Sequence, residues 1–251
     1  MKVSDYVIDF IASLGVDKVF CVTGGGAMHL NNSLGQSDKV TGVFMLHEQG
    51  ASIAAESYAR IREGYGVCLV TSGPGGTNAI TGLCGAYMDS IPVIFISGQA
   101  KRADLVGNQG IRQFGIQEVN IISMVKPYTK YAVQINDAND VRYELEKAAK
   151  MAVSDRPGAV WIDIPLDIQA SDVDIDSLKR YESEEKVPIV SSDELDEIIK
   201  ALNAAKKPAI VLGNGVRLSH AADKAQELVN ILQIPAFVSW NRLGHTVLAG
   251  L

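Results

Sequence analysis

Short apolar segments alternate regularly with helical segments through the first 170 residues, and this alternation constrains the fold more than any other feature. Apolar runs predict six strands, at residues 19–22, 40–44, 67–71, 93–97, 128–133 and 159–164. Helical spacing predicts intervening helices at residues 6–14, 27–34, 79–87, 121–124 and 138–153 and from residue 50 onward. Because strands that alternate with helices form parallel sheets, we predict an α/β fold with a parallel six-stranded sheet and helices on both faces.

Composition and charge narrow the classes of partner. The 251 residues are 47% hydrophobic and 21% charged, as in ordinary globular proteins. The net charge of −6 argues against nucleic acid or a membrane as the main partner. The longest apolar stretch, residues 91–97, is too short to cross a membrane, and the N-terminus does not resemble a signal peptide. Cys21, Cys68 and Cys84 lack metal-ligand spacing, so we expect free thiols, no metal site in this chain and a cytoplasmic location.

The composition changes after the predicted sheet. We interpret residues 1–170 as one domain and the charged, serine-containing residues 171–190 as a linker. Residues 191–251 return to the alternating pattern, with a helix from residue 192, strands at 209–212 and 236–239, and a helix at 221–232. Since two strands are too few for a stable sheet, we expect the incomplete start of a second α/β domain.

A carboxylate stands at one predicted strand-to-helix junction. Glu48 follows the strand at residues 40–44 and faces the positive end of the next helix. Glycine-rich turns follow two other strands, at residues 23–26 and 72–78, and suggest a ligand at the carboxyl edge of the sheet. A charge that only complements the helix dipole, and plain tight turns, are the simpler interpretations and stay open. A nucleotide-dependent dehydrogenase is the weaker hypothesis, because neither turn has a known phosphate-binding spacing.

Five motifs follow one another along the chain: HEQGA at 47–51, TSGPGGTN at 71–78, DSIP at 89–92, IQE at 116–118, and RPG at 156–158 with WIDIP at 161–165. Together they resemble the N-terminal, pyrimidine-binding domain of thiamine diphosphate-dependent enzymes of the acetolactate synthase-like group. The resemblance continues at residues 208–218 and 234–235 into the central domain of that family. It implies the thiamine diphosphate-binding fold and a transferase or lyase that decarboxylates a 2-oxo acid and ligates carbon to carbon.

The resemblance also implies roles for individual residues. Glu48 matches the family glutamate that hydrogen-bonds the aminopyrimidine of the cofactor and activates it, a task that suits a partly desolvated carboxylate. Gln117 matches a glutamine at the active centre, and the first glycine turn matches a loop near the reacting end of the cofactor. The implied catalytic residues are Glu48 and Gln117, and the implied cofactor-binding residues are Gly24, Gly25, Gly26, Glu48, Pro74 and Asn78.

Several features remain open within this resemblance. Ile116 stands where acetolactate synthases have Phe, so the preferred 2-oxo acid and its acceptor are not determined. The family binds Mg²⁺ and the diphosphate through a Gly-Asp-Gly motif in a C-terminal domain, which is absent from these residues, and only some relatives bind FAD. The family places its cofactor between two subunits, which implies a homodimer or homotetramer. A noncatalytic interaction module that retains the fold is the alternative.

Four further polar residues lie near the predicted turns or in the long polar loop at residues 98–115. We interpret His29 and His47 as hydrogen-bonded structural residues. Arg102 and Arg112 are able to hold a carboxylate bidentately. Ordinary solvation is the simpler role for both arginines in an exposed loop.

Overall fold

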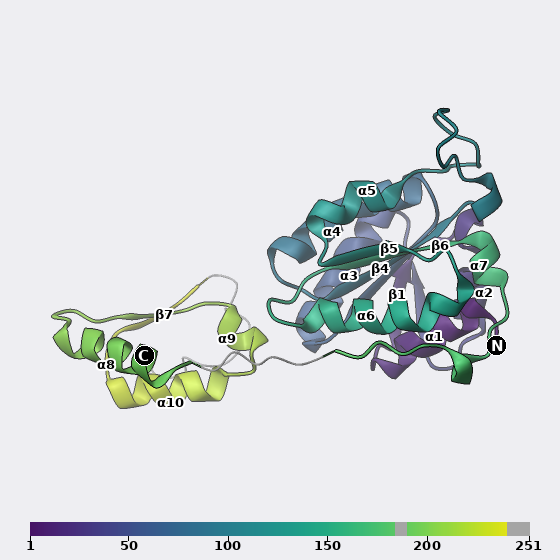
Figure 1. Cartoon of the computed structure of the whole chain (residues 1–251). Coiled ribbons are helices and arrows are strands. Elements are labelled where there is room, and N and C mark those ends of the chain that lie inside the picture. Colours follow the sequence, from purple (N-terminus) through teal and green to yellow (C-terminus); the bar gives the residue numbers. More distant parts are fainter. Residues whose placement is uncertain (184–189, 240–251) are drawn as a thin grey trace. The chain divides into compact units, whose positions relative to one another are not determined.

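Six parallel strands form the centre of the N-terminal part of this computed structural model (Figure 1). Their order in the sheet is β2-β1-β3-β4-β6-β5. The structure describes residues 1–183 and 190–239. The strands are β1 (Lys18–Cys21), β2 (Thr41–Phe44), β3 (Gly66–Val70), β4 (Val93–Gln99), β5 (Tyr131–Gln134) and β6 (Val160–Pro165). All neighbouring strands in this sheet pair in parallel, which confirms the prediction.

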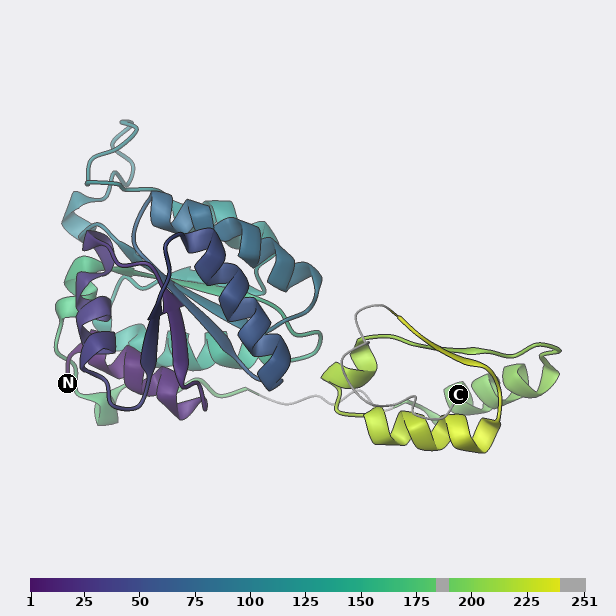
Figure 2. The ribbon, with the colours of Figure 1, turned by 180° about the vertical axis from the view of Figure 1, so that it is seen from behind.

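Helices cover both faces of the sheet. One face packs against α1 (Val3–Ser13), α2 (Met28–Gln36), α6 (Val141–Val153) and α7 (Leu166–Ala170). The other face packs against α3 (Glu48–Arg62), α4 (Pro74–Met88) and α5 (Ile121–Val125), and the view from behind shows α3 and α4 next to each other (Figure 2). Short 3-10 turns are η1 (Gly25–Ala27), η2 (Arg102–Asp104), η3 (Lys126–Tyr128), η4 (Ala138–Asp140) and η5 (Ile175–Ser177). Burial from both sides explains the nearly continuous apolar sequences of the central strands.

Two helices begin earlier than the sequence pattern predicts. α3 begins at Glu48 rather than residue 50, because the extended His47 serves as its N-cap. α4 begins at Pro74 rather than residue 79. Proline suits the first helical position, since its φ is already helical and its missing N–H needs no partner. The predicted turn at residues 72–78 is therefore wrong in extent, and most of it is the first part of α4.

The connections leave neighbouring strands toward opposite faces of the sheet at three places, between β2 and β1, between β1 and β3, and between β4 and β6. The chain leaves β1 toward α2 on one face and β3 toward α4 on the other. It also leaves β4 toward α5 and the adjacent β6 toward α7, again on opposite faces. Ligands of open α/β sheets bind in the crevices that such reversals create. We call the one between β1 and β3 the first crevice, and the one between β4 and β6 the second crevice.

The segment after the sheet is attached to the first unit of the chain. The Val173 N–H donates to Met1 O (2.9 Å), and Leu178 is buried. The first part of the predicted linker at residues 171–190 therefore packs against the sheet domain. Its residues 184–189 lie outside the described residues.

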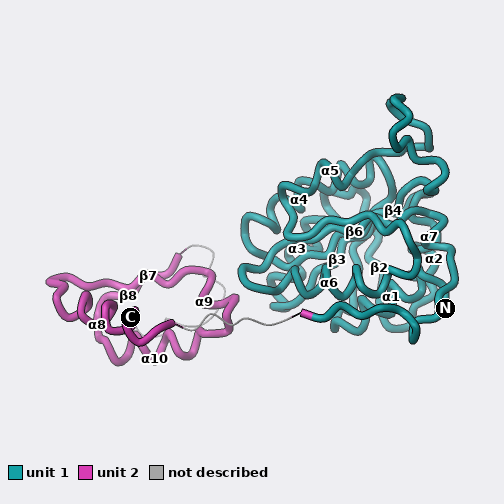
Figure 3. Tube along the Cα trace, viewed as in Figure 1, with its two compact units in different colours: residues 1–182 teal, residues 183–251 magenta. Residues whose placement is uncertain are grey.

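The chain divides into two compact units, Met1–Glu182 and Ser183–Leu251 (Figure 3). The second contains α8 (Ser192–Ala204), β7 (Ile210–Leu212), α9 (Gly215–Leu218), α10 (Ala222–Leu232) and β8 (Ala236–Val238). β7 and β8 pair in parallel, and Val211 and Phe237 are 73% and 58% exposed. Residues 240–251 of the predicted second domain lie outside the described residues. Within the part of the chain that the structure describes, no helix has the length and apolar character needed to cross a membrane.

Candidate functional site

Glu48 begins α3 shortly after the chain leaves β2. The preceding His47 accepts the Gln49 N–H at Nδ1 (3.1 Å) and so caps the helix. His29 Nδ1 lies 3.0 Å from Lys2 Nζ, so both histidines are engaged in hydrogen bonds. The Glu48 carboxylate lies in the first turn of α3, where the helix dipole favours negative charge.

Asn78 fixes the Glu48 carboxylate. Asn78 Nδ2, on α4, donates a hydrogen bond to Glu48 Oε2 (3.0 Å). The other carboxylate oxygen, Oε1, lies 3.7 Å from the position that a Cβ on Gly75 would take. Glu48 is half-buried, whereas Asn78 is exposed. The arrangement therefore orients the carboxylate through one oxygen and leaves the other oxygen available to a ligand.

The first glycine turn packs directly on the second. A Cβ on Gly24 would lie 2.5 Å from Thr71 Cβ, and a Cβ on Gly26 would lie 2.5 Å from Ser72 Oγ. The Gly26 N–H also donates to Thr71 Oγ1 (3.0 Å). A Cβ on Gly25, in contrast, would meet nothing within 4 Å. Gly24 and Gly26 are thus needed for the close approach of the two turns, while Gly25 borders open space.

Two amide side chains that sequence analysis did not identify hold the first glycine turn. Gln169 Nε2 donates to Gly26 O (2.8 Å) and to Ile164 O (2.7 Å), and Asn31 Nδ2 donates to Gly24 O (3.3 Å). Asn31 Oδ1 and Gln169 Oε1 are buried and have no partner within the described residues. Gln169 and Gly26 are 143 positions apart, so no local pattern could have indicated their contact.

The long loop reaches the same region through the backbone of Gln117. Gly73 has a φ of +58°, and a Cβ there would lie 2.4 Å from Gln117 O, so only glycine fits. Gln117 itself has a φ of +54°, and its side chain is exposed. The adjacent Ile116 is 87% exposed, so within this chain it is not the wall of a closed pocket.

The turn at residues 71–75 brings the implied site residues together. It contacts the first glycine turn through Thr71, and Gly73 lies close to the backbone of Gln117. Gly75 lies beside the Glu48 carboxylate. Pro74 is exposed at the start of α4. Residues 1–183 and 190–239 contain no group of three His, Cys, Asp or Glu side chains that could hold a metal. The first crevice therefore combines a carboxylate with closely packed glycine backbone, an arrangement suited to an organic ligand that offers a hydrogen-bonding group.

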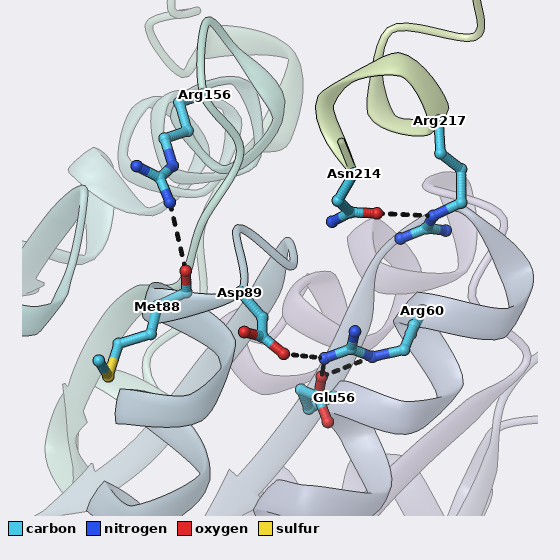
Figure 4. A network of polar contacts seen from close by, with 7 residues as sticks. All are labelled: Glu56, Arg60, Met88, Asp89, Arg156, Asn214 and Arg217. Atoms are coloured by element: carbon cyan, nitrogen blue, oxygen red, sulfur yellow. Dashed lines mark hydrogen bonds and ion pairs between the residues drawn. The ribbon is translucent and has the colours of Figure 1, made fainter. Parts of the chain in front are cut away.

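Other motif residues make structural contacts at the end of α4. The Arg60 guanidinium bonds Glu56 Oε1 through Nε (3.0 Å) and Asp89 Oδ2 through Nη2 (2.6 Å), as Figure 4 shows. Arg156 Nη2 donates to Met88 O (3.3 Å) in the same figure. The DSIP and RPG motifs therefore contribute to the fold by anchoring the C-terminal end of α4.

A buried carboxylate lies near the carboxyl ends of β4, β5 and β6. Asp163 is fully buried and accepts hydrogen bonds from Ser97 Oγ (2.6 Å) and Gln134 Nε2 (2.8 Å). It also accepts one from Gln99 Nε2 (3.2 Å), and Trp161 Nε1 donates to Ser97 Oγ (2.8 Å). Desolvation raises the pKa of Asp163 to about 6, although the three donors partly oppose the rise. The network links the three strands beside the second crevice.

The two arginines of the long loop have different surroundings. Arg102 Nε pairs with Asp167 Oδ2 (2.7 Å), and Arg102 Nη1 donates to Asn136 O (2.7 Å). The expectation of a merely solvated Arg102 is therefore wrong, because the loop folds back onto the ends of β5 and β6. Arg112 is exposed, lines a cavity and has no partner among the residues that the structure describes.

Comparison with known proteins places this fold in a family. The family model described as "Thiamine pyrophosphate enzyme, N-terminal TPP binding domain" matches residues 1–124, and that described as "Thiamine pyrophosphate enzyme, central domain" matches residues 195–246. The chain is 34% identical over 246 residues to the acetolactate synthase large subunit of Lactococcus lactis, covering 96% of this chain and 41% of that protein. It is 37% identical over 231 residues to an acetolactate synthase of Mycobacterium bovis, covering 91% of this chain and 36% of that protein. It is 31% identical over 251 residues to the chloroplastic acetolactate synthase of Arabidopsis thaliana, covering 97% of this chain and 36% of that protein.

These matches agree with the parallel sheet and with the HEQGA, TSGPGGTN and IQE motifs at its first crevice. The chain belongs to the thiamine pyrophosphate enzyme family, thiamine pyrophosphate being another name for thiamine diphosphate. Within that family it is similar to acetolactate synthases, which confirms the resemblance derived from the motifs. The chain spans about two fifths of the length of these relatives.

Proposed function

We propose that this chain forms the pyrimidine-binding side of a thiamine diphosphate site, in an enzyme that decarboxylates a 2-oxo acid and ligates the product to a second carbonyl compound. The observation that carries the proposal is the Glu48 carboxylate, held by Asn78 at the carboxyl edge of the sheet in a chain of this family. The names of the acetolactate synthase relatives support an enzyme with transferase or lyase activity.

The residues of the first crevice fit the aminopyrimidine of this cofactor. Glycine backbone at Gly25 borders open space, so a planar ring is able to approach closely. Glu48 Oε1 is the carboxylate oxygen that Asn78 does not hold, and it can share a proton with a ring nitrogen. When bound, thiamine diphosphate supplies a thiazolium that acts as an electron sink for decarboxylation.

Glu48 and Asn78 act together in this proposal. The half-buried Glu48 carboxylate shares a proton with the ring nitrogen through Oε1 in this proposal. Asn78 prevents rotation of the carboxylate by donating to Oε2. Pro74 and the exposed Gln117 border the same crevice, and Gln117 is proposed to contact the reacting groups.

The remaining assignments extend the same proposal. Mg²⁺ would bind with the diphosphate outside these residues, and a second subunit would complete the site in a homodimer or homotetramer. The visible absorbance of a purified active protein that contains this chain tests whether FAD is bound. A noncatalytic module with the same fold is the competing function, and it predicts that such a protein shows no thiamine-dependent turnover.

Glu48→Gln tests the central role in an active protein that contains this chain. Gln keeps the size and one hydrogen bond but cannot share a proton, so turnover should fall by about 100-fold or more. NMR exchange of the thiazolium C2 proton of bound cofactor should slow in parallel. Glu197→Gln, an exposed charge loss in the second unit, is the control and should change neither rate. Wild-type proton exchange in Glu48→Gln would disprove the assignment.

A further inference from the structure

A cavity of about 620 Å³ lies near the carboxyl ends of β4 and β5, bordered by the loop from β4 to α5. Its volume is in the range of small-molecule sites. It lies at the second crevice, one of the places where the sheet topology favours a ligand. Its lining includes Gln99, Leu105, Arg112, Glu118, Asn120 and Gln134. The proposed thiamine function uses none of these side chains.

The Glu118 carboxylate in the cavity lining accepts three backbone hydrogen bonds. Glu118 Oε1 accepts the Val106 N–H (2.6 Å). Glu118 Oε2 accepts the N–H groups of Phe114 (3.1 Å) and Gly115 (3.2 Å). Because three backbone dipoles point at this carboxylate, its repulsion of a bound anion is reduced.

The amide groups of the two glutamines are also fixed. Gln99 Nε2 donates to Val119 O (2.9 Å) and to Asp163 Oδ2 (3.2 Å), and Gln99 Oε1 accepts the Ala100 N–H (3.0 Å). Gln134 Nε2 donates to the same Asp163 oxygen (2.8 Å). These bonds turn both amide nitrogens toward the buried carboxylate. The oxygen of the Gln134 amide is neutral, so it does not prevent an anion from binding.

Two donor side chains in the cavity lining, those of Arg112 and Asn120, keep unused hydrogen-bonding capacity. Asn120 Oδ1 accepts the Ser123 N–H (3.1 Å) and caps α5, which leaves Asn120 Nδ2 without a partner within the described residues. The Arg112 guanidinium likewise has none there. Carboxylate oxygens only accept hydrogen bonds and match such donors. Leu105 and Ile122 add apolar lining that suits a short hydrocarbon chain.

We propose that this cavity binds a small organic carboxylate, which pairs with Arg112 and accepts a hydrogen bond from Asn120. The lining of the cavity includes neither Glu48 nor Asn78 nor the glycines of the first crevice, although Glu118 directly follows Gln117. The site requires neither a keto group nor thiamine diphosphate, so it stands or falls independently of the proposed function.

Butanoate is the probe, because it has a carboxylate, a short apolar chain and no keto group. We expect it to bind the full ¹⁵N-labelled chain with a Kd on the order of millimolar and to shift the NMR signals of Arg112 Nε–H and the Asn120 amide. Arg112→Gln should weaken binding about tenfold or more, since the charge-assisted pair is lost. Lys101→Gln removes the same charge from the same loop outside the cavity lining and should leave the Kd unchanged. Butanamide, the uncharged analogue, should bind about tenfold more weakly.

Two further measurements keep the outcome decisive. Leu105→Ala retains every charge but removes apolar lining, so it should weaken butanoate binding severalfold. Unshifted amide signals outside the loop in each variant show that the fold is retained. An unchanged Kd in Arg112→Gln, an equal loss in Lys101→Gln, or no signal shift up to about 50 mM butanoate would overturn the proposal.

Discussion

The buried Asp163 carboxylate should make the stability of the sheet domain depend on pH, and Asp163→Asn tests this. Asp163 is fully buried and bonded by Ser97, Gln99 and Gln134. Burial raises its pKa from 3.8 to about 6 in the folded protein. The folded state therefore holds the proton more tightly than the unfolded state does.

The sign and size of the effect follow from this difference in pKa. A carboxyl group with a raised folded pKa contributes its full stability below about pH 4 and loses it as pH rises through about 6. A rise of about two pKa units corresponds to about 3 kcal/mol, at about 1.4 kcal/mol for each unit. Between about pH 4.5 and 7.5, the accessible part of this loss is about 2 kcal/mol. The amide introduced by Asp163→Asn does not titrate. The difference between the free energies of unfolding, wild type minus variant, should therefore fall by this amount as the pH rises over that range.

Urea unfolding followed by Trp161 fluorescence is the assay, because Trp161 donates to Ser97 in the same network. Replacing Trp240 by Phe in every protein leaves Trp161 as the single tryptophan. Asp104→Asn, an exposed carboxylate lost from the same unit, is the control for a general change in charge. The wild-type minus Asp163→Asn difference is compared at several pH values, which cancels the other titrating groups. A difference constant within about 0.5 kcal/mol would refute the raised pKa.

Further outcomes are expected at three other places. Gly82→Ala should destabilise the chain by about 2 kcal/mol, because the added Cβ would lie 2.8 Å from the backbone C of Ser52. Gly85→Ala, on the open side of the same helix, should stabilise the chain by about 0.5–1 kcal/mol. The urea midpoints of both variants test these two expectations. Ile116→Phe, at an 87% exposed position, should change the ranking of 2-oxo acids by kcat/KM in an active protein containing this chain more than it changes Tm. Residues 1–251 alone should bind thiamine diphosphate only at about millimolar concentration and without a magnesium effect, because only the pyrimidine side is proposed here; micromolar, magnesium-dependent heats in calorimetry would contradict this.

The sequence predicts the sheet domain well and the details of the site less well. Apolar strands between helices indicate the parallel sheet, and the observed strand pairs confirm it. The sequence pattern places the start of α4 too late, because Gly75 and Gly76 suggest a turn when only neighbouring residues are considered. In the folded chain these glycines allow close packing against Thr71 and Ile121, so helix is retained. The roles of Glu48 and Gln117 remain predictions from the family resemblance.

The sequence by itself determined the strand and helix pattern, the glycines at the turns and the family of the chain, because these depend on neighbouring residues or on motifs in order. Only the tertiary structure decided which distant groups meet. Gln169 clamps Gly26 across 143 positions, and Asp163 gathers donors from two other strands. It also placed Arg112 at a cavity rather than in open solvent alone. Such contacts depend on strand order and crossover direction, which bring together side chains that no local periodicity relates.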